Sequence, residues 1–385
     1  MRYHNVCLEA FSYTLPDEVV TSAEIERRLE PLYQRLRLPE GRLELMTGIV
    51  ERRFWPRGML PSVKSVETAE KAIRLAGIDR QSIGALVHGS VCRDYLEPAT
   101  ACGVHHRLGL SRQCLVFDVS NACLGLLNGI VQIANMIELG QIRAGLVVGT
   151  ESARPLVETT IEHLNRDTTL SRRDVKAAIA SLTIGSGSAA VLLVDRSLSR
   201  TGNRLRGGVF RAHSDGCGLC RSDRDSSGDD MQPLMWTDSE SLLQQGVETA
   251  GRALPEFLDD VAWSADDITR TFCHQVGRAH QKLMFDTLGL DPAMDYSTLR
   301  WLGNTGSVAL PITAALGIEA GHLRGGDRVA LLGIGSGINV LMLAVDWQRA
   351  TVESPHAAGN LNLHRPHDAL GKERLRTEAG QVCSG

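Results

Sequence analysis

Residues 115–139 read LVFDVSNACLGLLNGIVQIANMIEL, and their pattern changes midway from that of a strand to that of a helix. The run 115–119 predicts a buried strand and 120–122 a tight turn, and from Leu124 onward apolar side chains on nearly every face predict a buried helix. Cys123 then lies at the first turn of that helix, where unpaired N–H groups favour a thiolate and can hold the oxyanion of a bound thioester. Cys123 is therefore either a nucleophile or a buried structural cysteine, the commoner role of a free cysteine.

The composition limits the classes of protein to which the chain can belong. Its 385 residues, 43% of them hydrophobic, can bury a large core as two domains or as one duplicated unit. A net charge of −4 gives no general attraction to nucleic acid or to an anionic membrane. The N-terminus lacks the pattern of a signal peptide, and no apolar run reaches the length of about 18 residues that suggests a membrane-spanning helix. We therefore expect a cytoplasmic protein that neither binds nucleic acid nor inserts into membranes.

The cysteines favour a reducing compartment. Nine cysteines, an odd number scattered without a secretion signal, predict free thiols rather than a disulfide framework. Cys217 and Cys220 form a CxxC pair, but neither a second pair nor a histidine pattern of ligand spacing completes a zinc site. We expect a surface loop there and no bound metal.

Strand-like and helix-like segments alternate along the chain, which predicts an α/β fold. In the first half, the expected strands are residues 83–91, 115–119, 144–150 and 187–195, and the expected helices are 66–78 and the segment after Cys123. After a polar stretch near 196–204 the pattern restarts, with strands at 205–213, 268–276, 327–337 and 338–347 and helices at 240–254, 277–290 and 307–321.

The restart predicts two halves, residues 1–198 with the cysteine and residues 199–348. The remaining segment, 349–385, is polar and has no sustained period, so we expect it to be disordered.

Several motifs resemble those of the thiolase superfamily, and of its ketoacyl synthase III branch in particular. They are FDVSNACLGLLNGI at 117–130, CHQVGRAH at 273–280, LGNTGSVALP at 302–311, LLGIGSGIN at 331–339 and TGIVERRF at 47–54. VCRDYLEPATA at 91–101 is similar to a loop of the enzymes that condense two fatty acyl-CoA molecules head to head in long-chain olefin biosynthesis. The resemblance implies a thiolase-like fold whose duplicated halves form an αβαβα core. It also implies a homodimer, or a heterodimer with a related subunit.

The resemblance assigns roles to three side chains in the order Cys, His, Asn. Cys123 holds one acyl group, while His274 and Asn304 donate hydrogen bonds to the enolate of the second substrate. Taken alone, His274 is more typical of a core histidine and Asn304 of a left-handed turn position. Their joint appearance in matching motifs favours the catalytic roles. No cofactor is implied, because coenzyme A thioesters are the substrates.

Other residues are assigned to substrate binding. The backbone N–H groups of Cys123 and Ser336 are expected to form the oxyanion hole, and Gly335 and Gly337 to line the substrate site in the same glycine-rich turn. This turn opens no helix, which argues against a dinucleotide site. Arg52 and Arg53 are expected to meet the CoA phosphates, with a solvated basic pair as an equal alternative.

Glu97 separates two possible reactions. A decarboxylating synthase obtains its carbanion by loss of CO₂ from a malonyl thioester, whereas joining two ordinary acyl-CoA molecules requires a base for an unactivated α-proton. In the olefin family this loop sends its glutamate into the partner's site, where burial would raise the pKa of a carboxyl. The alternative is a solvated loop glutamate. We expect Glu97 to be the base of a non-decarboxylative Claisen condensation that yields a 2-alkyl-3-keto acid or its thioester.

Other functions remain open from the sequence. They are a decarboxylating 3-oxoacyl-[acyl-carrier-protein] synthase III, the catalytic member of a heterodimer for a β-lactone natural product, and a non-catalytic partner subunit. A cysteine hydrolase also uses Cys, His and Asn, but it would lack the second α/β half.

Overall fold

A nine-stranded sheet runs through the part of the chain that the computed structural model describes, residues 1–222 and 234–351. Most of the expected tail, from residue 352 on, lies outside the described residues. The strand order is β11-β12-β13-β8-β1-β7-β6-β4-β5. The strands are β1 (Val6–Thr14), β4 (Ala85–Gly89), β5 (Leu115–Val119), β6 (Ala144–Glu151), β7 (Gly187–Asp195), β8 (Arg204–Ala212), β11 (Arg270–Cys273), β12 (Arg328–Gly335) and β13 (Asn339–Asp346).

The two halves repeat one strand order. In the first half β1, β7 and β6 are antiparallel neighbours, and β4 and β5 continue in parallel. In the second half β8, β13 and β12 are antiparallel neighbours, and β11 continues in parallel. A single parallel bridge between Thr271 and Asp295 stands where the first half has β5. This repetition confirms the predicted α/β fold of duplicated halves.

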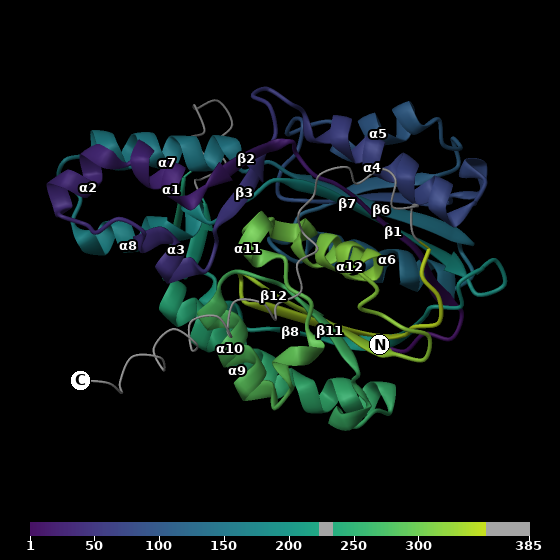
Figure 1. The fold of residues 1–385 in the computed structure, drawn as a ribbon. Coiled ribbons are helices and arrows are strands. Elements are labelled where there is room, and N and C mark those ends of the chain that lie inside the picture. The colour runs from purple at the N-terminus through teal and green to yellow at the C-terminus, as the bar shows by residue number, and fades with distance from the viewer. Residues whose placement is uncertain (223–233, 352–385) are drawn as a thin grey trace, which may run out of the picture. The chain divides into compact units, whose positions relative to one another are not determined.

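Helices complete a layered arrangement (Figure 1). The outer helices are α4 (Pro61–Ala76) and α5 (Thr100–Leu108) on the first half and α9 (Ser239–Val261) and α10 (Arg278–Leu288) on the second. Between the two halves lie α6 (Gly125–Glu138) and α12 (Ala309–Glu319). Both inner helices are mostly buried, as expected for helices that are apolar on nearly every face.

A smaller group of helices packs beside these layers, around the hairpin of β2 (Glu18–Thr21) and β3 (Glu51–Phe54) at the left of Figure 1. Its members are α1 (Ser22–Arg28), α2 (Glu30–Leu36), α3 (Arg42–Thr47), α7 (Arg154–Arg166) and α8 (Arg172–Leu182). The short elements α11 (Leu299–Leu302), β9 (Cys220–Ser222) and β10 (Met235–Thr237) complete the fold.

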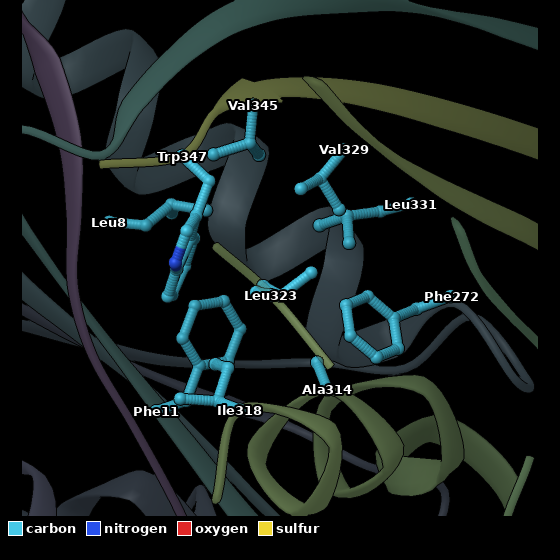
Figure 2. Close-up of a pocket in the computed structure, with 10 residues that line it drawn as sticks. All are labelled: Leu8, Phe11, Phe272, Ala314, Ile318, Leu323, Val329, Leu331, Val345 and Trp347. Carbon is cyan, nitrogen blue, oxygen red and sulfur yellow. The ribbon is translucent and has the colours of Figure 1, made fainter. Parts of the chain in front are cut away.

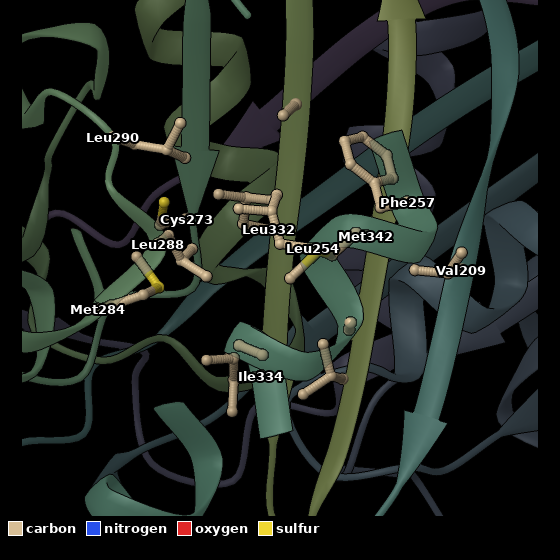
Figure 3. Close-up of a cluster of buried hydrophobic side chains, with 14 of the residues drawn as sticks. Val209, Leu254, Phe257, Cys273, Met284, Leu288, Leu290, Leu332, Ile334 and Met342 are labelled. Carbon is tan, nitrogen blue, oxygen red and sulfur yellow. The ribbon is translucent and has the colours of Figure 1, made fainter. Parts of the chain in front are cut away.

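The core of the second half fixes the direction of the strand that leads to His274. Cys273, the last residue of β11, points into an apolar cluster with Met284 and Leu288 of α10 (Figure 3). Successive side chains of an extended chain point to opposite faces. His274 therefore faces the inner layer, where α6 and α12 lie.

Packing between β1, β12, β13 and α12 leaves no room for a ligand. The space among Phe11, Phe272, Trp347 and their apolar neighbours is about 10 Å³, at the lower limit of what one water molecule needs (Figure 2). This side of the inner layer is therefore packed core.

Two features of the first half differ from the sequence-based expectation. Residues 115–119 form the predicted strand β5, but Leu115 is 51% exposed because β5 is the last strand of the sheet. The prediction of a buried strand is therefore wrong, since an apolar run does not reveal whether a second neighbour is present. The pattern analysis also missed β1, which lies at the centre of the sheet.

Candidate active site

Cys123 follows a strained turn. Helix α6 begins at Gly125, so Cys123 lies just before the N-cap residue Leu124 rather than inside the first turn. Ala122 has a φ of 43°, in the left-handed region that costs a residue with a side chain about 1–3 kcal/mol. The N–H of Leu124 donates to the carbonyl of Asn121 at 2.9 Å. The turn therefore projects Cys123 in a fixed direction from the end of β5.

Two backbone N–H groups act on the sulfur. The N–H groups of Cys123 and Ser336 both lower the pKa of the Cys123 thiol, so both lie close to it. Gly335 makes this approach possible, because a Cβ at that position would lie 3.1 Å from Cγ of Leu124 and 3.6 Å from the Cys123 nitrogen. The structure thus brings together the two N–H groups that were predicted to form an oxyanion hole.

The Cys123 thiol is neutral at rest. Desolvation by burial, and then the nearby Cys220 and Glu151, raise its pKa to about 12, while its hydrogen bonds from the two N–H groups act in the opposite direction. The predicted thiolate is therefore wrong. The helix start cannot compensate for desolvation, since Cys123 precedes the helix and has no positively charged neighbour among the causes of the shift.

His274 offers two free nitrogens. The residue is buried, and neither Nδ1 nor Nε2 has a hydrogen-bond partner in the part of the chain that the structure describes. Its backbone N–H donates to the carbonyl of Leu332 at 3.0 Å, which holds it against the same strand that ends at Gly335. Desolvation, with a smaller contribution from His280, lowers the pKa of His274 to about 3. A neutral imidazole with both nitrogens free is suited to a polar ligand.

Asn304 is held from both sides. Its backbone N–H donates to the carbonyl of Thr183, and its carbonyl accepts from the N–H of Gly185, each at 2.9 Å. Its side-chain Oδ1 accepts from the N–H of Gly306 at 2.9 Å, which leaves the amide nitrogen as the donor that faces other groups. The left-handed positions of this turn belong to Gly303 and Gly306, not to Asn304.

The glycine-rich turn after β12 is tied to the turn that carries Cys123. Gly337 has a φ of 131°, and a Cβ there would lie 2.5 Å from Nδ2 of Asn339. That amide donates to Oδ1 of Asn121 at 3.3 Å. The predicted contact of Gly335 and Gly337 with substrate stays a prediction, but both lie in the turn that holds Ser336 against the nucleophile.

Glu97 lies at the exposed tip of its loop. Asp94 accepts from the N–H of Ser62 at 2.9 Å, and its own N–H donates to Thr100 Oγ1 at 3.0 Å, so the loop is fastened on both sides of the tip. Between these points Tyr95 and Leu96 are 58% and 54% exposed, and Glu97 is exposed as well. Within one chain, Glu97 therefore lacks the desolvated environment expected of the base.

Arg52 does not offer its charge to a phosphate. It is completely buried, and its guanidinium donates to Oγ of Ser22 at 3.1 Å and to the carbonyl of Leu182 at 3.2 Å. Burial lowers its pKa to about 10. Arg53 is half-buried and donates to the carbonyl of Pro16 at 2.9 Å. The predicted role of this pair in binding CoA is wrong for Arg52 and unsupported for Arg53, because both guanidinium groups donate to oxygens of the protein itself.

The CxxC segment lies near the site without forming a metal centre. Cys217 is exposed, and Cys220, on β9, is half-buried and contributes to the raised pKa of Cys123. Residues 1–222 and 234–351 contain no cluster of three or more His, Cys, Asp or Glu side chains that could hold a metal ion. Within the same ranges, no helix combines the length and apolar character needed to cross a membrane.

Sequence reasoning missed Glu151. This buried residue closes β6, and its charge acts on both Cys123 and Cys92. The available signal was a carboxylate directly after the apolar run AGLVVGT, at a strand end where functional side chains often gather.

Two family models match the chain. The N-terminal domain of thiolase matches residues 62–178. The C-terminal part of 3-oxoacyl-[acyl-carrier-protein] synthase III matches residues 258–347. The first match includes Cys123, and the second includes His274, Asn304 and Ser336.

Individual relatives cover almost the whole described chain. The acyl-CoA:acyl-CoA alkyltransferase of Shewanella oneidensis is 43% identical over 351 residues, which are 90% of this chain and 100% of that protein. The enzyme of the same name from Xanthomonas campestris is 35% identical over 347 residues, with the same coverage. A crystal structure of a cysteine-to-serine variant of Xanthomonas campestris OleA, with bound lauric acid and lauroyl-CoA, superposes with a TM-score of 0.84 at 34% identity. It covers 90% of this chain and 100% of that one. These matches confirm the resemblance that the motifs indicated.

Proposed function

Because this chain belongs to the acyl-CoA:acyl-CoA alkyltransferase family, we propose that it joins two fatty acyl-CoA molecules in a Claisen condensation without loss of CO₂. The product is a 2-alkyl-3-ketoacyl thioester or the keto acid derived from it. The chain is then an acyltransferase of lipid biosynthesis, with coenzyme A thioesters as substrates and no further cofactor.

One observation carries this proposal: His274 is buried and neutral, and neither of its ring nitrogens has a hydrogen-bond partner in the part of the chain that the structure describes. A condensing enzyme needs a nucleophile for one acyl group and separate donors for the enolate of the other. Cys123 supplies the first, and His274 with Asn304 supplies the second.

In the first step, the sulfur of Cys123 attacks the thioester carbonyl of one acyl-CoA. The N–H groups of Cys123 and Ser336 hold the resulting oxyanion. Since the thiol is neutral, its proton must leave as the new S–C bond forms, and the sulfur of the departing CoA is the proposed acceptor. The step releases one CoA and leaves the acyl group on Cys123.

In the second step, Glu97 removes an α-proton from another acyl-CoA. His274 and Asn304 donate to the enolate oxygen, and the α-carbon attacks the acyl carbonyl on Cys123. The new C–C bond expels the Cys123 thiolate, which takes up the proton held by Glu97. Atoms balance: two acyl-CoA molecules yield one 2-alkyl-3-ketoacyl-CoA and one free CoA.

Glu97 requires a second subunit to act in this way. The tip of its loop carries exposed Tyr95 and Leu96, and among the described residues β5 has no strand partner on its outer side, where Leu115 is exposed. Exposed apolar side chains beside a free strand edge are typical of an interface. We therefore propose a homodimer in which Glu97 of each chain extends into the active site of its partner. A heterodimer with a related subunit, as in β-lactone pathways, would use the same surface.

We place this reaction in the cytoplasm. The cysteines of the described residues, Cys123 included, are all free, which suits a reducing compartment.

The experiment that tests the function is incubation with a single saturated acyl-CoA and no malonyl thioester, followed by mass spectrometry of the products. We expect one CoA released per acylated cysteine and then a β-keto product. If product forms only when a malonyl thioester is added, the chain is a decarboxylating synthase. If Cys123 is acylated but neither mixture yields product, the catalytic member of an incomplete heterodimer is the better description.

A further inference from the structure

Glu151 is a buried carboxylate that the reaction steps above do not use. It is 5% exposed, and no ion pair joins it to any residue that the structure describes. Instead, its oxygens accept hydrogen bonds from the N–H groups of Val91 (3.0 Å), Cys92 (3.2 Å) and Ser307 (3.3 Å), and from Oγ of Ser307 (2.5 Å). A buried charge is costly unless it is fully hydrogen-bonded, and here both oxygens are engaged.

These hydrogen bonds join two segments that are distant in sequence. Val91 and Cys92 begin the loop that carries Glu97, and Ser307 lies in the turn that follows Asn304. Ser307 Oγ also lies 3.0 Å from the carbonyl of Gly89, with which its single hydroxyl hydrogen is shared, and so links β4 to the same turn. One carboxylate thus fastens the base of the Glu97 loop to the Asn304 turn.

The Asn304 turn is shaped around this carboxylate. Gly306 has a φ of 59°, and a Cβ there would lie 3.3 Å from both Cγ and Cδ of Glu151. The N–H of the same glycine donates to Oδ1 of Asn304 and so decides which way the amide points. The carboxylate therefore acts on the orientation of Asn304 through the glycine.

We propose that Glu151 is a positioning residue for the condensation step, and that it holds the Glu97 loop and the amide of Asn304 in one fixed arrangement. This inference rests on the proposed function. It assigns Glu151 no contact with substrate. All the groups that Glu151 meets are donors, so two acceptor oxygens are required, and a carboxylate is the side-chain group that supplies them.

Glutamine at this position would lose the hydrogen bonds at one of the two terminal atoms of the side chain. Its NH₂ group would have to face the N–H of Cys92 or the donors of Ser307, and two donors cannot pair. The substitution would also remove a negative charge that, with Cys220, opposes ionisation of Cys123. Condensation and thiol reactivity should therefore change in opposite directions, which simple unfolding would not produce.

The test compares Glu151→Gln, Glu151→Asp and Glu9→Gln with the wild type. Glu9 is the matched control, because it is equally buried and accepts from Ser199 Oγ, the N–H of Arg200 and Thr201 Oγ1, outside the site. Three quantities are measured: the rate of Cys123 acylation by acyl-CoA, the rate of condensation, and the pH dependence of Cys123 alkylation by iodoacetamide.

We expect Glu151→Gln to slow condensation roughly 10- to 100-fold, the scale on which a small misplacement of reacting groups acts. Acylation should stay within a few-fold of wild type, and alkylation at pH 8 should become faster because the thiol pKa falls. Glu151→Asp keeps the negative charge but moves the carboxylate back by the length of one CH₂ group. Condensation should therefore slow, while the rate of alkylation should change less. Glu9→Gln should leave all three quantities unchanged per folded molecule.

Each contrary result has a distinct meaning. Wild-type condensation in Glu151→Gln overturns the inference. An equal fall of acylation, condensation and alkylation also overturns it, because the role is then only structural. If the wild type makes no product from acyl-CoA alone, the proposed function fails, and the inference fails with it.

Discussion

Each half of the molecule has a turn just before its inner helix, and the proposed chemical roles of the two turns are opposite. In the first half the turn that ends at Cys123 precedes the inner helix α6, and in the second half the turn around Asn304 precedes α12. The first contains a strained alanine and a thiol, whereas the second contains left-handed glycines and a fixed amide. Duplication thus supplies two equivalent positions between the two halves, and under the proposed function one holds the nucleophile and the other a donor.

The edges of the halves differ in a related way. The first half ends in a full strand, β5, with the Glu97 loop nearby, while the second half keeps only the bridge between Thr271 and Asp295 at that place. The first half therefore presents a terminal strand together with the exposed carboxyl group of Glu97. The predictions below test whether the first half supplies the nucleophile and the base and the second half supplies the donors.

The largest effect is expected at the nucleophile of the first half. Cys123→Ser should reduce condensation by at least about 1,000-fold, because no thioester can form on the enzyme. Intact-mass measurement after mixing with a saturated acyl-CoA should show one added acyl group on the wild type and none on the variant. An unmodified wild type would contradict the assignment.

Glu97→Gln should have the next largest effect. It should reduce the rate of condensation about 100- to 10,000-fold, the usual contribution of a general base. The variant should still become acylated, and the acyl-enzyme should accumulate. If the glutamate serves the partner, mixing Glu97→Gln chains with Cys123→Ala chains should restore some product in hybrid dimers, where one site regains both groups. The absence of rescue after verified subunit exchange would place Glu97 in its own chain's site or outside the reaction.

Removing a hydrogen-bond donor from the second half should reduce the rate of condensation by a smaller factor. His274→Ala or Asn304→Ala should slow condensation by about 100- to 1,000-fold, as the loss of an oxyanion donor does. Acylation should partly survive, most clearly in Asn304→Ala, since the N–H groups of Cys123 and Ser336 remain. Single-turnover measurements of acylation and condensation separate the two steps. Wild-type condensation in both variants would show that the donor turn has no such role.

The smallest effect concerns pH rather than a substitution. With a pKa raised to about 12, Cys123 is a neutral thiol throughout the range where the protein is assayed. Below the pKa the thiolate fraction rises tenfold per pH unit, so alkylation of the free enzyme by iodoacetamide should increase about tenfold from pH 7 to 8 and again from 8 to 9. A plateau near neutral pH would mean that the pKa is depressed and would contradict the structure.

Local patterns predicted much of this fold and the order of its site residues. The alternating segments located β6, β7, β12 and β13, because buried strands are continuous apolar runs. The motifs around Cys123, His274 and Asn304 could be found because each combines glycines or a turn with one reactive side chain. The ketoacyl synthase resemblance then connected them.

Properties that depend on distant neighbours could not be predicted in this way. Nothing in the Arg52–Arg53 pair reveals that the first guanidinium is buried among carbonyl and hydroxyl groups. The direction of the Cys123 pKa shift depends first on burial and then on Cys220 and Glu151, and all three arise only in the folded chain. The exposure of β5 likewise depends on what lies beside it, which its own residues do not specify.

The neutral resting thiol also affects how this protein can be inhibited and stored. Peroxides and small electrophiles react with thiolates, so Cys123 should resist oxidation and should score poorly in screens of reactive fragments. Covalent ligands would instead gain their rate from a chain or head group that binds first and brings a carbonyl to the two N–H groups. Potency within such a series should therefore follow noncovalent affinity rather than intrinsic electrophilicity.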